Sequence, residues 1–210
     1  STRFAEAIRE CRRIASTFLD IRISMLLTNA EEVIFGFAEK AESDKLQTQF
    51  LEANHLLKNS RVKIRDAFAR AFRKGFDDLR SRQESRPNGS SEDWGSLEEW
   101  SLVDNAELSE NVVAANLIEE AENAHFSALY ALHQRFSLTA GGRILEYEKM
   151  PVGPHRIVGS FRHAIGSIEL DQKIRLVLYT LLRDHVLRDL DSIYSPMNQA
   201  LKAHGILPNL

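Results

Sequence analysis

The sequence predicts an all-α protein, a multi-helix bundle of about six or seven helices, some of them long. Glycine and proline are scarce, with 10 and 5 copies in 210 residues, and this balance favours helices over a turn-rich β architecture. Apolar residues recur at helical spacing along most of the chain, and the sequence shows no alternating strand pattern. We expect one packed domain overall, made of N-terminal helices at 1–83, an acidic flexible loop at 84–103 and C-terminal helices at 104–210.

The apolar pattern of the first 83 residues predicts two shorter helices and one long one. A stripe from Phe4 to Met25 predicts the first helix, and Val33 to Ala41 predict a short second helix after a cap at Thr28–Asn29. From Leu46 to Leu79 the apolar positions stay on one face for most of the span, at about 100° per residue. This long stripe thins near Ser60, where a kink is expected.

The helical pattern stops at a segment that we place at residues 84–103. Its first part, Ser85–Ser91, has the composition of a flexible loop, and its second part is acidic and holds both tryptophans. Tryptophan is enriched in binding hot spots. We therefore predict that a protein partner binds this segment, through Trp94, Trp100, Glu98 and Glu99. The alternatives are that both tryptophans pack onto the bundle or that the segment is a linker.

Residues 104–210 predict a second set of helices. Asp104, with Glu107 three residues later, resembles a capping box at the start of a helix. The apolar stripe of that helix continues to Phe136, and the pair Gly141–Gly142 follows it as a stop signal.

Proline, a change of phase and glycine mark the remaining helices. Pro154 suits the first position of a helix whose buried side begins at Ile157. The apolar face turns near His185, which predicts either a chain break or one helix that packs on two sides. Gly205 followed by Ile206 resembles a glycine stop with an apolar contact after it.

The net charge of −3 conceals three unequal blocks. Residues 1–83 carry a net charge of +4, residues 84–122 carry −10 and residues 123–210 carry +3. This balance excludes a uniformly basic nucleic-acid binder. Within the first block, Lys58–Arg82 has a local charge of +6. Its basic face consists of Arg61, Arg65, Arg70, Arg73 and Lys74.

We interpret this basic face as a solvated side of a helix, because no set of stacking aromatic side chains accompanies the charges. Nucleic-acid binding through residues 58–82 is the alternative, in which the cations contact phosphates. The charge blocks also suggest a further hypothesis, that the acidic segment lies along the basic helix within one molecule and masks it until a partner competes.

The single cysteine leaves no internal disulfide to form, so a reducing cytoplasm is the predicted compartment. Cys11 lies on an apolar stripe, and we interpret it as a core residue. No apolar run approaches the ~20 residues that a bilayer-spanning helix needs, so we predict no membrane span. We also predict no cofactor.

Two Glu-x-x-His motifs are the nearest approach to an enzyme signature, Glu52–His55 and Glu122–His125. In four-helix bundles, two such motifs and two further glutamates form a di-metal carboxylate site. Helix phase places the first motif in water, opposite the apolar stripe, and the second on or near the apolar face. We therefore assign no metal ligand or catalytic residue. A di-metal or hydrolytic enzyme using Glu122 and His125 stays open as an alternative.

Several blocks of the sequence resemble a known family, and they are spread over nearly the whole chain. They are the opening block Arg9–Ala15, then Glu119–Glu122, Ala128–Leu132, Gln134–Arg135, Val152–Pro154, Ser160–Arg162, Arg175–Tyr179, Asp184–Leu187 and the closing block Gly205–Leu210. Together they resemble the N-terminal helical region of a large proteobacterial family of unknown function, whose members often carry an automatic "thymidine phosphorylase" label. The closing block is the most specific part of the resemblance.

What the resemblance implies about activity is limited. Some longer members of that family are described as carrying a C-terminal PilZ domain, which binds cyclic di-GMP. Arg61 and Arg65 have the first spacing of the PilZ signature but lie in a helix, and Asp93 stands where a glycine is needed. We therefore expect this segment not to bind cyclic di-GMP through a PilZ motif. The phosphorylase label has no support either, because the sequence has no glycine-rich phosphate loop.

These observations predict a non-enzymatic helical interaction or regulatory domain of a bacterial cytoplasmic protein. Such a domain binds a protein partner or dimerises, and the resemblance allows a place within a cyclic di-GMP-responsive protein. The enzyme and nucleic-acid alternatives stay open, from two different classes of function.

Overall fold

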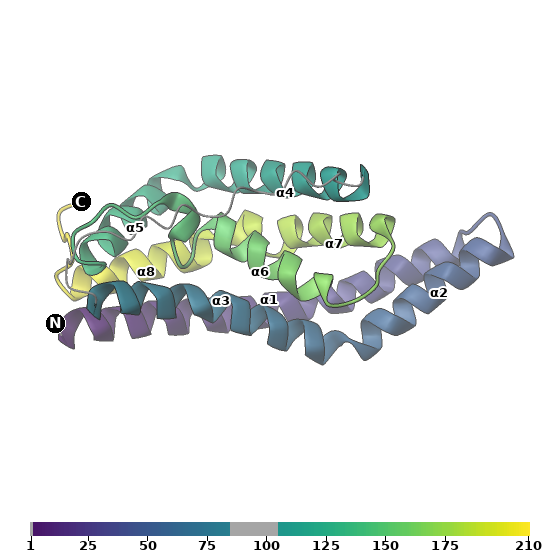
Figure 1. The fold of residues 1–210 in the computed structure, drawn as a ribbon, viewed down its shortest axis with the longest axis horizontal. Coiled ribbons are helices and arrows are strands. Elements are labelled where there is room, and N and C mark those ends of the chain that lie inside the picture. The colour runs from purple at the N-terminus through teal and green to yellow at the C-terminus, as the bar shows by residue number, and fades with distance from the viewer. Residues whose placement is uncertain (1, 85–104) are drawn as a thin grey trace.

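The computed structural model describes residues 2–84 and 105–210, and over these residues it contains helices and no strand (Figure 1). The α-helices are α1 (Thr2–Glu39), α2 (Asp44–Asn59), α3 (Arg61–Glu84), α4 (Asn105–Ala124), α5 (Phe126–Thr139), α6 (Pro154–Gly166), α7 (Gln172–His185) and α8 (Asp191–Ala203). Two short 3-10 turns are η1 (Tyr147–Lys149) and η2 (Leu187–Asp189). Single residues separate α2 from α3 and α4 from α5. If each of these two kinked pairs is counted as one helix, six helices remain among the described residues. The predicted all-α bundle of about six or seven helices is therefore confirmed.

The N-terminal half corrects one predicted boundary and confirms another. The predicted cap at Thr28–Asn29 is wrong, because α1 continues through it. The Thr28 hydroxyl donates to Ser24 O at 3.1 Å, four residues back in the same helix, so it caps nothing. The kink near Ser60 is confirmed, since this residue alone separates α2 from α3. Ser43 starts α2 by accepting the N–H of Leu46 at 3.2 Å.

A second correction concerns the predicted helix that runs through Phe136. It bends at His125, which separates α4 from α5 and has φ −114° and ψ 21°. The backbone hydrogen bonds continue across the bend, from His125 N to Ala121 O and from Leu129 N to His125 O. Because the helical hydrogen bonds are kept across the bend, the spacing of apolar residues gives little sign of it. The stop at Gly141–Gly142 is confirmed, because both glycines have positive φ just after α5.

Three predicted signals in the last part of the chain are confirmed, at Pro154, His185 and Gly205. Pro154 occupies the first turn of α6. The chain breaks after His185, the last residue of α7, so the first of the two alternatives there is confirmed. The side chain of His185 forms a hydrogen bond with Asn29 Oδ1 at 3.0 Å, so the end of α7 is joined to α1. Gly205 follows α8 with φ +71°, and Ile206 after it is fully buried.

The longest helix, α1, contacts α2, α3, α7 and α8. Figure 1 shows α2 and α3 running back alongside α1, with both chain ends at one end of the molecule. The phenylalanines of α3 face the core, where Phe76 meets Phe136 of α5 edge to face at 6.4 Å between ring centroids. With its apolar face buried, α3 has α1 on one flank and α6 on the other. Within the described ranges, no helix has both the length and the apolar character needed to cross a membrane.

Candidate anion-binding grooves beside α3

The predicted basic face of α3 is divided between two of its flanks. Arg65 and Arg73 lie toward α1, whereas Arg70 and Lys74 lie toward α6. The division follows from helix geometry, because neighbouring residues point about 100° apart. Arg61 lies in neither place, since its Nη2 is 2.6 Å from Glu31 Oε1 of α1. The five cations therefore do not form one surface.

The α1–α3 groove is a cavity of about 640 Å³ between these two helices. Sequence reasoning missed its largest group of cations, which comes from α1. Five arginines line it, namely Arg9, Arg12, Arg13, Arg65 and Arg73. The side chains beneath them are apolar and buried, namely Leu19, Ile23, Phe68 and Phe72. Asp20 is the one acidic residue among those that line the groove.

The arginines of this groove differ in how they are paired. Arg65 Nη2 lies 2.8 Å from Asp20 Oδ1, and Arg12 Nη1 lies 3.5 Å from Asp77 Oδ1. Toward the part of the chain that the structure describes, Arg73 donates only to the backbone of its own helix, from Nε to Ala69 O. Within residues 2–84 and 105–210, Arg9 and Arg13 form no hydrogen bond or ion pair. Because a guanidinium presents five donors, much of the donor capacity here is open to solvent.

The α3–α6 cavity lies on the other flank of α3 and measures about 680 Å³. Arg70 and Lys74 face it from α3, and His155, Arg156 and His163 face it from α6. Glu148 of η1 adds one negative charge at the same cavity. The α3–α6 cavity, like the α1–α3 groove, is therefore lined by more basic than acidic side chains.

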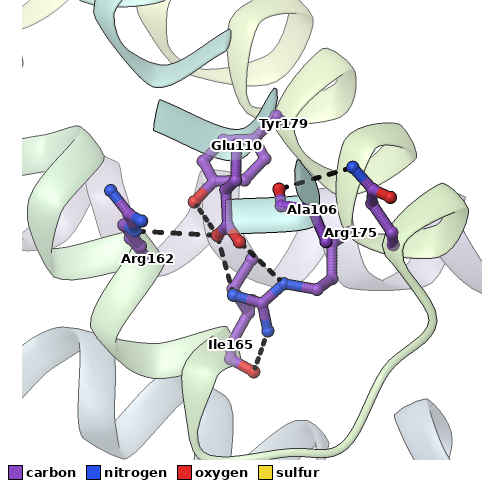
Figure 2. A network of polar contacts seen from close by, with 7 residues as sticks. Ala106, Glu110, Arg162, Ile165, Arg175 and Tyr179 are labelled. Carbon is purple, nitrogen blue, oxygen red and sulfur yellow. Dashed lines mark hydrogen bonds and ion pairs between the residues drawn. The ribbon is translucent and has the colours of Figure 1, made fainter. Parts of the chain in front are cut away.

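A closed charge network lies elsewhere, where α4 meets α6 and α7 (Figure 2). Glu110 of α4 is only 8% exposed. Its carboxylate accepts two hydrogen bonds from Arg175, at 2.7 and 3.1 Å, and one from the Tyr179 hydroxyl at 2.6 Å. Arg162 approaches it at 3.7 Å. The Glu110 carboxylate of α4 therefore has partners on both α6 and α7.

These contacts set the protonation of the network. Burial by itself raises the pKa of Glu110, but the hydrogen bonds from Arg175 and Tyr179 and the charges of Arg175 and Arg162 outweigh it, so the pKa lies below its usual value. Burial, and then the hydrogen bond to Glu110, raises the pKa of Tyr179. Glu110 therefore stays charged and Tyr179 stays neutral near pH 7. Their contacts indicate that they hold α4 against α6 and α7.

Sequence reasoning did not single out Glu110. Its partners, however, lie in two of the blocks that carry the family resemblance, Ser160–Arg162 and Arg175–Tyr179. A third block contains Arg135, which is 1% exposed and donates to the backbone carbonyls of Ile206, Leu207 and Leu210. These three blocks therefore contain residues that join one helix to another, or to the segment that follows α8.

The structure does not bring the two Glu-x-x-His motifs together. Glu52 and His55 are exposed, as helix phase predicted. Glu122 lies 3.2 Å from His155, whereas His125 turns inward and bonds through Nε2 to Leu187 O at 2.8 Å. Among the described residues, no three His, Cys, Asp or Glu side chains are grouped so that they could hold a metal ion. Glu122 and His125 thus have separate partners.

Cys11 is buried in the core, as expected from its apolar stripe. Burial, helped by the charge of Glu10, raises the pKa of its thiol to about 12. The thiol stays protonated near pH 7, so Cys11 is a poor nucleophile. The predicted partner-binding residues Trp94, Trp100, Glu98 and Glu99 lie outside the described residues, and that site stays a prediction.

Comparison with protein families decides the relationship of this chain. The family model described as "Protein of unknown function (DUF1631) N-terminal domain" matches residues 3–205. The chain belongs to this family. The resemblance inferred from the sequence blocks is thereby confirmed, since the DUF1631 family is one of unknown function. No curated protein and no solved structure matches the chain.

Proposed function

We propose that this DUF1631 N-terminal domain is a non-enzymatic interaction domain that binds an acidic, amphipathic segment of a partner protein in the α1–α3 groove. The observation that carries the proposal is the pairing of an apolar floor with arginines that lack carboxylate partners. Within residues 2–84 and 105–210, Arg9 and Arg13 have no partner, and Arg73 donates only to Ala69 O of the same helix. Arginine is suited to carboxylates because its planar fork can donate two parallel hydrogen bonds.

The apolar part of the groove supports a peptide over a small anion. Leu19, Ile23, Phe68 and Phe72 lie at the groove, and Ile21 beside them is 55% exposed. A helix that enters a groove typically contributes apolar anchors at a spacing of three or four residues. A partner helix with leucines on one face and glutamates along its edges would satisfy both the floor and the arginines.

The same features weigh against nucleic acid as the ligand. Two cations of the predicted basic face are already paired within the chain, Arg61 with Glu31 and Arg65 with Asp20. Arg70 and Lys74 point to a different flank. A continuous phosphate backbone would meet interrupted rather than continuous positive charge.

The test is fluorescence anisotropy with a labelled amphipathic peptide that carries glutamates on one helical face and leucines on the other. We expect saturable binding that weakens as salt rises. Replacing Arg9→Glu together with Arg13→Glu should weaken binding about tenfold or more, because two attractive charges become repulsive. The matched control is Lys40→Glu with Lys45→Glu, which makes the same charge change at exposed positions beyond the groove.

Two results would overturn the proposal. One is an equal loss of affinity in both double variants, which would mean that net charge alone drives binding. The other is tighter binding of a single-stranded oligonucleotide than of the peptide, which would favour the nucleic-acid alternative.

The acidic segment 84–103 has the chemistry of the proposed ligand, since it holds five acidic residues, one basic residue and both tryptophans. It is therefore the natural internal competitor for the groove. Replacing Glu98→Gln and Glu99→Gln should raise the affinity for the added peptide if this segment competes. An unchanged affinity would assign the groove to external partners alone.

A further inference from the structure

We infer that the α3–α6 cavity is a separate binding site for a small phosphate monoester. Its lining is cationic, as in the α1–α3 groove, but it contains no large apolar side chain. Arg70 and Lys74 of α3 and Arg156 of α6 supply three fixed positive charges, against one negative charge from Glu148. This excess of about two positive charges matches a phosphate monoester, which carries roughly −1.5 to −2 at pH 7.

The cations of this cavity have unused capacity. Within the described residues, Arg70 and Lys74 form no hydrogen bond or ion pair. Arg156 is held only loosely, with Nη2 at 3.8 Å from Asp78 Oδ2, and its buried Nε has no hydrogen-bond partner among those residues. The exposed donors of Arg70 and Lys74 would gain charge-assisted hydrogen bonds when an anion with several oxygens arrives.

Gly75 explains how Arg156 comes to lie against α3. A Cβ at this position would be 2.9 Å from Arg156 Nε and 3.2 Å from Pro151 Cα, so only glycine leaves room for this approach. The guanidinium is therefore placed by the packing of α6 on α3. Arg70 and Lys74 stand on the exposed side of α3, four residues apart and so on one face.

The shape of the cavity indicates a ligand larger than phosphate alone. Its volume of about 680 Å³ lies within the range of about 300–1,000 Å³ typical of small-molecule sites. The lining contains no large apolar side chain; Ala71 and Gly159 are its apolar members. Such a lining suits a polar organic part, such as a sugar, attached to the phosphate.

The experiment is a calorimetric titration of the intact chain with two probes, inorganic phosphate and ribose 5-phosphate. We expect saturable binding of both, with the ester at least as tight. Arg70→Ala combined with Lys74→Ala should weaken binding about tenfold or more, because each removes a contact to a charged ligand. The control is Arg80→Ala, which removes a positive charge from an exposed position of α3 outside this cavity.

A second variant blocks the cavity without removing charge. Gly159 is exposed on α6, and a Cβ there would meet nothing within 4 Å. Gly159→Leu should therefore leave folding intact, as followed by circular dichroism, while its side chain occupies part of the cavity and weakens binding. Unimpaired binding in this variant would overturn the proposal.

The remaining outcomes are equally decisive. Binding of inorganic phosphate without binding of the ester would overturn the monoester assignment. Absence of saturable binding, or an equal loss in Arg80→Ala, would show that the cavity is not a site. None of these results depends on the peptide assay, so the two proposals can fail separately.

Discussion

The carboxylate of Glu110 and the guanidinium groups of Arg9 and Arg13 lie in the same bundle under opposite electrostatic conditions. Glu110 is buried, and Arg175, Arg162 and Tyr179 together meet its charge and its hydrogen-bonding capacity. Arg9 and Arg13 are exposed beside an apolar floor and have no partner within the part of the chain that the structure describes.

The contrast separates charge that stabilises the fold from charge that is available for binding. A buried carboxylate must be paired, since an unpaired buried charge costs several kcal/mol. An exposed arginine has no such requirement, because water solvates it. Leaving several of them over an apolar groove therefore costs the fold little and leaves their donors open to solvent.

The largest expected effect is in the closed network. Glu110→Ala removes the acceptor of three hydrogen bonds and leaves Arg175 without its carboxylate partner. We expect the free energy of unfolding to fall by about 3 kcal/mol, as measured by urea denaturation. The control is Glu120→Ala on the exposed side of the same helix, which should change stability by less than about 0.5 kcal/mol. Equal effects of the two substitutions would contradict the closed network.

The network also predicts how stability depends on pH. The pKa of Glu110 is lowered in the folded state below its ordinary value of 4.5. A lowered pKa means that the stabilisation is fully present above pH 4.5 and is lost as pH falls through the folded-state pKa. Glu110→Gln keeps the shape but cannot ionise. The stability difference between the wild type and this variant should hold from pH 7 to about 5 and shrink at lower pH.

Urea denaturation of both proteins across this pH range is the measurement. The expected loss is smaller than that caused by Glu110→Ala, because Gln still accepts hydrogen bonds through its amide oxygen. A difference that stays constant well below pH 4.5 would show that the charge of Glu110 adds nothing to stability.

The fold was largely predictable because apolar spacing reports which side of a helix is buried. The stripe from Leu46 to Leu79 covered most of α2 and α3, and its thinning near Ser60 marked their junction. The bend at His125 was missed because the backbone hydrogen bonds and the apolar stripe both cross it. The false cap at Thr28 arose because threonine can also bond inside a helix.

The candidate sites were less predictable, because they depend on which helices become neighbours. The spacing of nine residues on α3 shows that Arg65 and Lys74 point in opposite directions, but not that α1 and α6 receive them. The pairing of Glu110 with Arg175 spans 65 residues of sequence and leaves no local pattern. From the sequence alone, Arg9 and Arg13 could not be assigned to a candidate site, because that assignment depends on α3 lying beside α1.

The smallest expected effect on stability comes from the open arginines, and it tests the other half of the contrast. Arg9→Ala combined with Arg13→Ala removes two charges but breaks no hydrogen bond or ion pair within residues 2–84 and 105–210. The free energy of unfolding should therefore change by less than about 0.5 kcal/mol. In the same protein, affinity for the acidic peptide should fall about tenfold, because each arginine would contact a carboxylate of the ligand.

Glu110→Ala should lower stability, whereas Arg9→Ala with Arg13→Ala should leave stability unchanged and weaken peptide binding, so measuring both quantities distinguishes the two kinds of charge. If the double variant unfolds as easily as Glu110→Ala, the α1 arginines are part of the folding energetics and the groove is not held open for a ligand. If its stability is unchanged and the peptide still binds as tightly, the peptide is bound by other residues. The proposal that these arginines bind an acidic partner requires unchanged stability together with weakened peptide binding.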